Sequence, residues 1–176
     1  GSMGFGYALG VDLPGEKRGM IPNAPYYDKA YRGSWNGLTV ISISIGQGEV
    51  NATPLQIANL GATIANRGWF ITPHVVKDIQ DEELDSLYTT RRYTMADAAN
   101  YEYVVQGMRQ AVLAGTCHAA NSPHYEVCGK TGTAQNPHGQ DHSAFMGFAP
   151  MNEPKIAICV YVENGIWGAT FGVPIG

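Results

Sequence analysis

The last third of the chain places the strongest limit on its fold. Residues 127–134, 143–149 and 156–162 are short apolar or alternating segments of the kind that form strands. They are separated by Asn136-Pro-His-Gly139 and Pro150-Met-Asn-Glu-Pro154, which are both rich in turn-forming residues. Three strands at such close spacing predict an antiparallel meander.

A mostly apolar helix is predicted ahead of this meander. Thr53 has the chemistry of an N-cap, and Pro54 suits the first helical position. Apolar residues follow, and Asn66-Arg67-Gly68 provides the glycine that commonly ends a helix. Because almost no residue before Arg67 is charged, we expect this helix to be buried in the centre of the fold.

A second helix is predicted at about residues 95–113. Thr94-x-x-Asp97 resembles a capping box at its start. The preceding segment, residues 74–94, mixes acids, bases and threonines, which predicts a strand followed by an exposed linker. One side of the helix would carry its apolar residues, which are Tyr101, Val104, Val105, Met108 and Val112.

The first third is rich in glycine, proline and tyrosine. Residues 3–37 show little periodicity and are expected to form an ordered, turn-rich segment. The alternating, β-branched run Leu38–Ile45 predicts a strand, although a short apolar run can also open a buried helix. With 44% hydrophobic and 15% charged residues, the composition is that of a globular domain. Together these segments predict an α/β chain of the α+β type, with a mainly antiparallel sheet flanked by helices.

The charge and the cysteines exclude several classes of function. The formal net charge is -4. The basic pairs Lys17-Arg18 and Arg91-Arg92 are interpreted as solvated surface, so we expect no nucleic-acid partner. The 3 cysteines are too few and odd in number for a disulfide scaffold, so at least one should be a free, buried thiol. No apolar run reaches the roughly 18–20 residues of a membrane span.

The sharpest chemical signal is Cys128-Gly-Lys-Thr-Gly-Thr-Ala134, on the first of the predicted strands. Lys130 would place a positive charge beside a nucleophile and a substrate carboxylate. Thr131 and Thr133 offer hydroxyl hydrogen bonds. Gly132 has no side chain, so an extended peptide could lie along the strand and pair with its backbone. The N–H of Thr133 could then help to stabilise a tetrahedral oxyanion.

This motif has two competing interpretations when it is taken alone. Gly129-Lys-Thr131 also ends the phosphate-loop motif, which needs a glycine five residues before Gly129. This chain has His124 there, so the phosphate-loop pattern fails. The other interpretation is a surface strand in which Lys-Thr-Gly occurs by chance.

Further motifs occur in a fixed order around this strand. Gly10–Glu16, Ser44–Gly48 and Ala52–Gln56 precede it, and Ser143–Pro150 and Val162–Gly165 follow. The series extends over most of the chain and resembles the class B penicillin-binding proteins, the monofunctional cell-wall transpeptidases. Within that class it is most similar to penicillin-binding protein 2, the elongation-type enzyme.

The resemblance implies the fold shared by penicillin-binding transpeptidases and serine β-lactamases, here as an incomplete fragment. It also implies a reaction in which the stem peptide of peptidoglycan acylates a serine, D-alanine leaves, and the acyl group passes to a neighbouring amine. β-Lactams acylate the same serine. Lys130 and the Thr133 N–H would be catalytic, while Thr131, Gly132 and Thr133 would bind the substrate. No cofactor and no metal are implied.

The family's other motifs are not found in the chain. No serine is followed by a lysine at the third position, so the S-x-x-K nucleophile is missing. Ser34-Trp-Asn36 matches S-x-N, but the family's own S-x-N lies upstream of the Gly10–Glu16 turn, so we interpret it as a decoy. We therefore expect residues 3–176 to be the C-terminal part of a transpeptidase domain, inactive alone. Gly1-Ser2 is interpreted as a tag remnant, and the family's closing helix is expected to be absent or only begun.

Other candidate features have simpler explanations. His138-Gly-Gln-Asp-His142 could bind a metal, but a solvated loop is favoured, in which Asp141 or His142 shapes access to the site. Cys128 is expected to be a packed thiol rather than a reactive one. Gly46-Gln-Gly48 is expected to be scaffold, as are the Thr53-Pro54 helix start and the turn at residues 12–16. Ordinary packing is also expected for the aromatic residues Tyr26, Tyr27, Tyr31 and Trp35.

Two functional alternatives stand beside the transpeptidase. A degenerate domain could serve as a scaffold or binding module in cell-wall synthesis, although the intact Lys130-Thr-Gly-Thr133 argues against it. A serine β-lactamase shares the fold and the strand motif but not the longer series. The resemblance further implies stem peptides, β-lactams and the elongation machinery as partners. It also implies a parent protein anchored in the cytoplasmic membrane, with this domain facing the periplasm.

Overall fold

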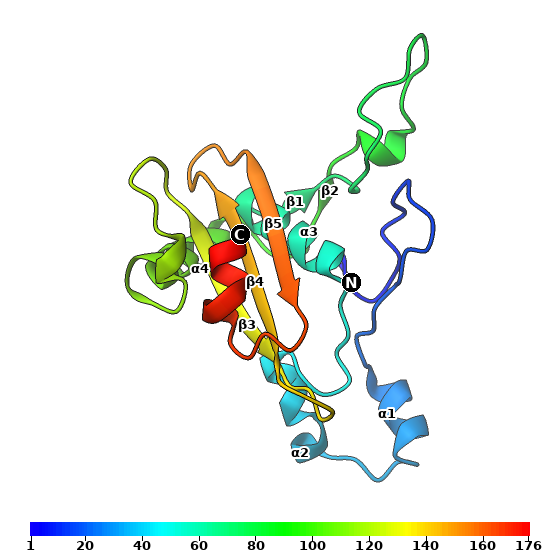
Figure 1. The fold of residues 1–176 in the computed structure, drawn as a ribbon. Helices are drawn as coiled ribbons and strands as arrows, with labels where there is room; N and C mark the ends of the chain where they lie inside the picture. Colours follow the sequence, from blue (N-terminus) through cyan, green and yellow to red (C-terminus); the bar gives the residue numbers. More distant parts are fainter.

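The computed structural model describes residues 1–176, and a three-stranded antiparallel sheet in the order β3-β4-β5 lies at its centre (Figure 1). Thr131 of β3 lies opposite Phe145 of β4, which lies opposite Val160 of β5. The predicted meander is confirmed, and β3 is an edge strand that pairs with β4 alone. The strands are β3 (Cys128–Ala134), β4 (His142–Ala149) and β5 (Ile156–Val162).

Two helices cover one face of this sheet. α3 (Pro54–Ala65) packs against β4 and β5, and α4 (Ala98–Ala114) packs against β3. A buried apolar cluster fills the space between them, and full burial of such a side chain contributes about 1.5–3 kcal/mol. Its members are Ile64, Ala65, Tyr101, Val105, Met108, Cys128, Phe148 and Met151.

α3 forms where the sequence predicts it, and it also anchors the N-terminal segment. The Thr53 hydroxyl accepts a hydrogen bond from the Gln56 N–H (3.1 Å), and the Gln56 side chain accepts one from the Thr53 N–H (3.0 Å). Gly68, beyond the helix end, has a φ of +109°. The buried Gln56 amide also donates to the carbonyls of Tyr7 (3.1 Å) and Arg18 (3.0 Å). The predicted central helix is confirmed.

α4 also forms as predicted, but it begins differently. Asp97 is the N-cap residue, yet its side chain accepts no capping hydrogen bond, so the predicted capping box is wrong. Thr94 is held beside Gly68 by a backbone hydrogen bond (2.8 Å), and its hydroxyl pairs with the Tyr101 hydroxyl (2.7 Å). Four of the five predicted apolar side chains are buried, whereas Val104 is 45% exposed.

The C-terminal residues cover part of the opposite face of the sheet. A π-helix, Gly168–Gly172, packs against β4, and α5 (Val173–Ile175) follows it. Val173 is buried with Phe145, and the Gly172 N–H donates to the Ser143 hydroxyl (3.0 Å). The helix expected at this end is therefore three residues long.

Residues 38–45 form helical turns, so the predicted strand is wrong. α2 (Gly37–Val40) continues into a 3-10 helix, Ile41–Ile45. The Asn36 side chain accepts hydrogen bonds from the N–H groups of Leu38 and Thr39, which starts the helix. A strand would need a neighbouring strand for its backbone groups, whereas the Asn36 cap and the helical turns satisfy them locally. Leu38 stays 78% exposed, so the alternative of a buried helix is also wrong.

The first third contains one helix that the sequence analysis missed. α1 (Ala24–Ala30) begins at the N-cap Asn23, whose side chain accepts a hydrogen bond from the Tyr26 N–H (3.0 Å). Asn23 and Pro25 together are a helix-start signal that the low periodicity of this segment obscured. The rest of the segment is turn-rich, as predicted.

Residues 71–91 form an arm that projects from the body (Figure 1, green). It lies between β1 (Trp69–Phe70) and β2 (Arg92–Tyr93), which pair antiparallel. The linker in residues 74–94 is exposed as predicted, but the strand lies at the end of the segment rather than at its start.

None of the helices in the chain is both long and apolar enough to cross a membrane. Two further 3-10 helices are Ser86–Tyr88 and His118–Ala120.

Candidate active site

The four predicted site residues lie side by side on the edge strand β3. Side chains alternate across a strand, so Lys130 and Gly132 share one face while Thr131 and Thr133 share the other. The register places Lys130 opposite Met146 and Thr131 opposite Phe145. The motif therefore presents its cation on the face covered by α3 and α4, and its hydroxyls on the face covered by the π-helix.

Lys130 carries a charge that no acid of the chain neutralises. Its Nζ donates a hydrogen bond to the Thr131 carbonyl (2.7 Å), and the side chain is exposed. The only ion pair in the chain joins Arg67 to Glu102 (2.7 Å). Lys130 lines a hollow of about 190 Å³ between α3 and the sheet, together with the apolar side chain of Leu60. An anion that entered this hollow would meet an unpaired ammonium group beside apolar walls.

The two glycines of the motif have different structural demands. A Cβ at Gly129 would lie 2.5 Å from Cε2 of Phe145, so packing requires glycine there. A Cβ at Gly132 would meet only the Cβ of Ala144, at an ordinary 3.5 Å, and Gly132 does not adopt a positive φ. Nothing within the chain requires glycine at position 132, as expected if another molecule approaches the strand there.

Thr131 meets a side chain that the sequence analysis did not single out. Thr116 lies in the turn after α4, and its Oγ1 is 2.7 Å from Oγ1 of Thr131. The two threonines are 15 residues apart. No local pattern could reveal this contact, because it depends on where α4 ends relative to β3.

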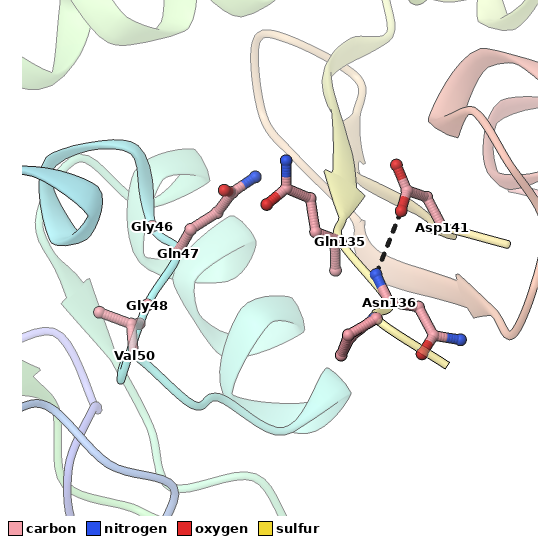
Figure 2. Close-up of a pocket in the computed structure, with 9 residues that line it drawn as sticks. Gly46, Gln47, Gly48, Val50, Gln135, Asn136 and Asp141 are labelled. Atoms are coloured by element: carbon pink, nitrogen blue, oxygen red, sulfur yellow. Dashed lines mark hydrogen bonds between the residues drawn. The ribbon is translucent and has the colours of Figure 1, made fainter. Parts of the chain in front are cut away.

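A second hollow, of about 610 Å³, opens where β3 ends (Figure 2). One wall is Gly46-Gln-Gly48, in which both glycines have positive φ and a Cβ at Gly48 would lie 2.5 Å from the Ser42 hydroxyl. The two glycines thus shape the backbone of this wall, and the scaffold role expected for the whole segment Gly46-Gln-Gly48 stays a prediction at Gln47. Gln47 between them extends toward Gln135 on the opposite wall, and neither side chain has a hydrogen bond within the chain. Two free amides therefore line this hollow.

The motif order, the fold and this edge-strand site agree with one protein family. The family description of the penicillin binding protein transpeptidase domain matches residues 1–172. The chain belongs to this transpeptidase family. Its fold class is thereby confirmed, since the mixed helices and antiparallel sheet match solved structures of transpeptidases over almost the whole chain.

Three similar proteins show the extent of the match. The peptidoglycan D,D-transpeptidase MrdA of Acinetobacter baumannii is 34% identical over 193 residues, covering 95% of this chain and 28% of MrdA. Pseudomonas aeruginosa PBP2, crystallised with WCK 5153, has a TM-score of 0.86 and 37% identity, covering 99% of this chain and 40% of that one. Helicobacter pylori PBP2 in complex with MreC has a TM-score of 0.84 and 28% identity, covering 99% and 32%. The chain thus spans well under half of each relative.

In this transpeptidase domain, the loop between β3 and β4 uses its polar side chains to stabilise turns. Asp141 accepts a hydrogen bond from the Asn136 N–H (3.1 Å), and the Asn136 side chain accepts one from the His138 N–H (3.0 Å). The Asn164 N–H donates to Nδ1 of His142 (3.1 Å). No three His, Cys, Asp or Glu side chains gather as a metal site requires. Asp141 also lines the larger hollow, so it can influence access to the end of β3.

The three cysteines of the transpeptidase domain are all free. Cys128 and Cys117 are fully buried, as predicted for at least one thiol. Burial raises the pKa of Cys128 to about 11, so its thiol stays protonated near neutral pH. Burial raises the pKa of Cys117 and Cys159 as well. Cys128 is therefore a packing residue behind Lys130, as the sequence analysis expected.

The aromatic residues of the first third form a packed cluster around Glu49. Tyr27 is buried and lies 5.8 Å from the Tyr31 ring and 5.4 Å from the Trp35 ring, between centroids. The hydroxyls of Tyr27 and Tyr31 both donate to the Glu49 carboxylate (2.8 Å each). Burial, with this carboxylate, raises the pKa of Tyr27 to about 12. Trp35 donates to Asp28 (2.7 Å), which supports ordinary packing in and around Ser34-Trp-Asn36.

Proposed function

We propose that this chain is the part of a peptidoglycan D,D-transpeptidase that binds the stem peptide and stabilises its acyl transfer to a serine. One observation carries the proposal: the unpaired edge of β3 presents Lys130-Thr-Gly-Thr133, and Gly132 is not required by packing or backbone conformation. A peptide can lie along such an edge as an additional strand, with backbone hydrogen bonds to β3.

Each residue of the motif would have a distinct task. The Lys130 ammonium assists proton transfer and attracts the substrate carboxylate. It is available for both tasks because no acidic side chain of the chain pairs with it. The hydroxyls of Thr131 and Thr133 hold that carboxylate. The Thr133 N–H stabilises the oxyanion formed when the serine attacks the D-alanyl carbonyl. The terminal D-alanine then leaves, and an amine of a neighbouring stem peptide takes the acyl group.

The hollow beyond β3 would receive the substrate's next residues. A peptide that continues along the strand reaches the free amides of Gln47 and Gln135 after Ala134. Primary amides can both donate and accept hydrogen bonds. They can therefore pair with the N–H and C=O groups of a stem peptide, which apolar side chains cannot do.

The partners and the location of the protein are further parts of the proposal. We infer that β-lactams acylate the same serine, and that the parent protein is anchored in the cytoplasmic membrane with this domain in the periplasm. We also infer that it works with the elongation machinery. The partner inference is supported by one relative, because the structure of Helicobacter pylori PBP2 is a complex with MreC.

Residues 1–176 contain no S-x-x-K motif, so the serine nucleophile would come from another part of the protein. We therefore expect the chain alone to be inactive. The test is to incubate the chain, and a form extended upstream in its gene, with a penicillin and to record intact masses. A stable adduct on the extended form alone supports the transpeptidase. An adduct on the chain itself would contradict the inactive-fragment hypothesis, and no adduct on either would favour a non-catalytic scaffold.

A Lys130→Met variant of the extended form tests the motif. Methionine keeps an apolar stem of similar length and removes the charge. Loss of a proton-transfer group slows such reactions by about 100-fold or more, so acylation should slow on that scale. Lys155→Met, at an exposed position outside the site, is the matched control and should leave the rate unchanged. Equal rates for the two variants would remove Lys130 from the mechanism.

A further inference from the structure

Thr116 is the only side chain outside β3 that forms a hydrogen bond with a hydroxyl of the motif. Its Oγ1 lies 2.7 Å from Oγ1 of Thr131, and either atom could be the donor. The buried Cys117 thiol also lies beside the hydroxyls of Thr116 and Thr131, whereas the Thr133 hydroxyl has no hydrogen-bond partner in the chain. The Thr116 hydroxyl is thus the oxygen donor or acceptor that the chain places within hydrogen-bond distance of Oγ1 of Thr131.

The path of α4 brings Thr116 to Thr131. Near its middle, Val105 packs in the same cluster as Cys128, on the face of the sheet that also carries Lys130. Near its end, Val112 packs with Phe145, which is on the face that carries Thr131. The C-terminal end of α4 thus passes around the edge of β3.

The turn that follows α4 is held firmly on both sides of Thr116. Gly115 permits a close turn, since a Cβ there would lie 2.8 Å from the Cα of Ala111. Cys117 is fully buried, and its N–H donates to the Ala111 carbonyl (3.0 Å). Thr116 lies between these two anchored residues, so its backbone is held beside Thr131.

The contact between the two hydroxyls has a direction that an anion can select. A hydroxyl has a single proton, so Thr131 can donate either to Thr116 or to a substrate. If Thr116 donates to Thr131, the Thr131 proton is free for a carboxylate, which only accepts. A chain of hydrogen bonds that ends on a charged acceptor is stronger than its separate links.

We propose that Thr116 is a positioning residue, whose hydroxyl donates to Oγ1 of Thr131 and directs the Thr131 proton to the carboxylate of the stem peptide or of a penicillin. The proposal rests on the proposed function, because it requires that Thr131 binds this carboxylate. It adds a residue that lies outside the strand motif and acts through Thr131.

The test is a double-mutant cycle in the extended form of the protein. The second-order rate constant of acylation by benzylpenicillin is measured by intact mass for the wild type, Thr116→Val, Thr131→Val and the double variant. Thr116→Val removes the hydrogen bond that orients the Thr131 hydroxyl toward the carboxylate, and loss of one such bond should slow acylation about five- to tenfold. The double variant should be no slower than Thr131→Val, and Thr116→Ser should stay within about twofold of the wild type.

The controls separate positioning from folding and from the proposed function itself. Thr90→Val, in the projecting arm, should leave both the rate constant and the Tm unchanged. If the losses of Thr116→Val and Thr131→Val multiply in the double variant, or if Thr116→Ser is as slow as Thr116→Val, the positioning role is overturned. If the wild-type extended form is not acylated at all, the proposed function fails instead, and the two failures are thereby distinguished.

Discussion

The sheet with its two helices and the first 50 residues are stabilised in different ways. In the sheet region, Phe145, Phe148 and Val105 are all at most 2% exposed. In residues 1–50, the only buried large apolar side chains are Leu9 and Tyr27. Apolar burial therefore explains the sheet region but not the order of the first third.

Polar side chains that collect several backbone groups order the first third instead. The Glu16 carboxylate accepts hydrogen bonds from the N–H groups of Leu9, Gly10 and Val11, at 2.6, 2.9 and 3.2 Å. Gln56 reaches from α3 to two carbonyls of the same segment. Each such bond contributes about 0.5–1.5 kcal/mol, so a few of them can order a segment that buries little apolar surface. The site strand lies in the region held by burial, where its geometry is rigid.

Removing a core side chain is the strongest test of this difference. Phe145→Ala should lower the free energy of unfolding by about 3–5 kcal/mol, because it leaves a cavity between β4 and Val173. Leu13→Ala, at a position 54% exposed in the first third, should change it by less than about 0.5 kcal/mol. Urea unfolding of the chain measures both. Equal effects would refute the idea that burial stabilises only the sheet region.

The two glycines of the strand motif sharpen the comparison within β3. Gly129→Ala should destabilise the chain by about 1–3 kcal/mol, because its Cβ collides with Phe145. Gly132→Ala should change stability by less than about 0.5 kcal/mol. In the extended form, Gly132→Ala should still slow acylation by a penicillin. A stable Gly132→Ala variant with unchanged acylation would mean that no substrate approaches this position.

Gln56 tests the hydrogen bonds that order the first third. Gln56→Met removes the donor to Tyr7 and Arg18 and leaves both carbonyls without it, which should cost about 1–3 kcal/mol. Hydrogen exchange should accelerate in residues 3–20 more than in the sheet. Gln47→Met makes the same replacement at a side chain that has no hydrogen bond within the chain. It should leave the free energy of unfolding nearly unchanged. Uniform acceleration over the whole chain would show that the two regions unfold together.

The Glu49 cluster provides the smallest effect, through pH. Hydrogen bonds from the Tyr31 and Tyr27 hydroxyls lower the pKa of Glu49 below its ordinary value of 4.5. The pKa of Glu49 is lower in the folded state than in the unfolded state, so the ionised carboxylate stabilises the fold fully above the unfolded-state pKa. The contribution is lost as the pH falls through the folded-state pKa. Glu49→Gln should therefore flatten the acid decline of Tm below about pH 4.5. An unchanged decline would exclude Glu49 from the acid response.

Local signals were sufficient for the elements that a few neighbouring residues determine. Thr53 and Pro54 predicted the start of α3, and the turn residues between the apolar runs predicted the meander. The same logic failed at residues 38–45, because an alternating pattern does not show whether a partner strand is available. There the cap at Asn36 decided for a helix. It also failed at the capping box predicted for Thr94-x-x-Asp97, because the N-cap is Asp97 and its side chain accepts no capping hydrogen bond.

The sequence by itself determined the strand motif at Lys130–Thr133, the order of motifs that identifies the family, and the two helices that cover one face of the sheet. Only the tertiary structure decided which residues meet that strand: Thr116 beside Thr131, and Gln47 across the hollow from Gln135. The physical reason is range. Capping and periodicity act between residues a few positions apart, whereas these contacts follow from the path that core packing imposes on α4 and on the loop before α3.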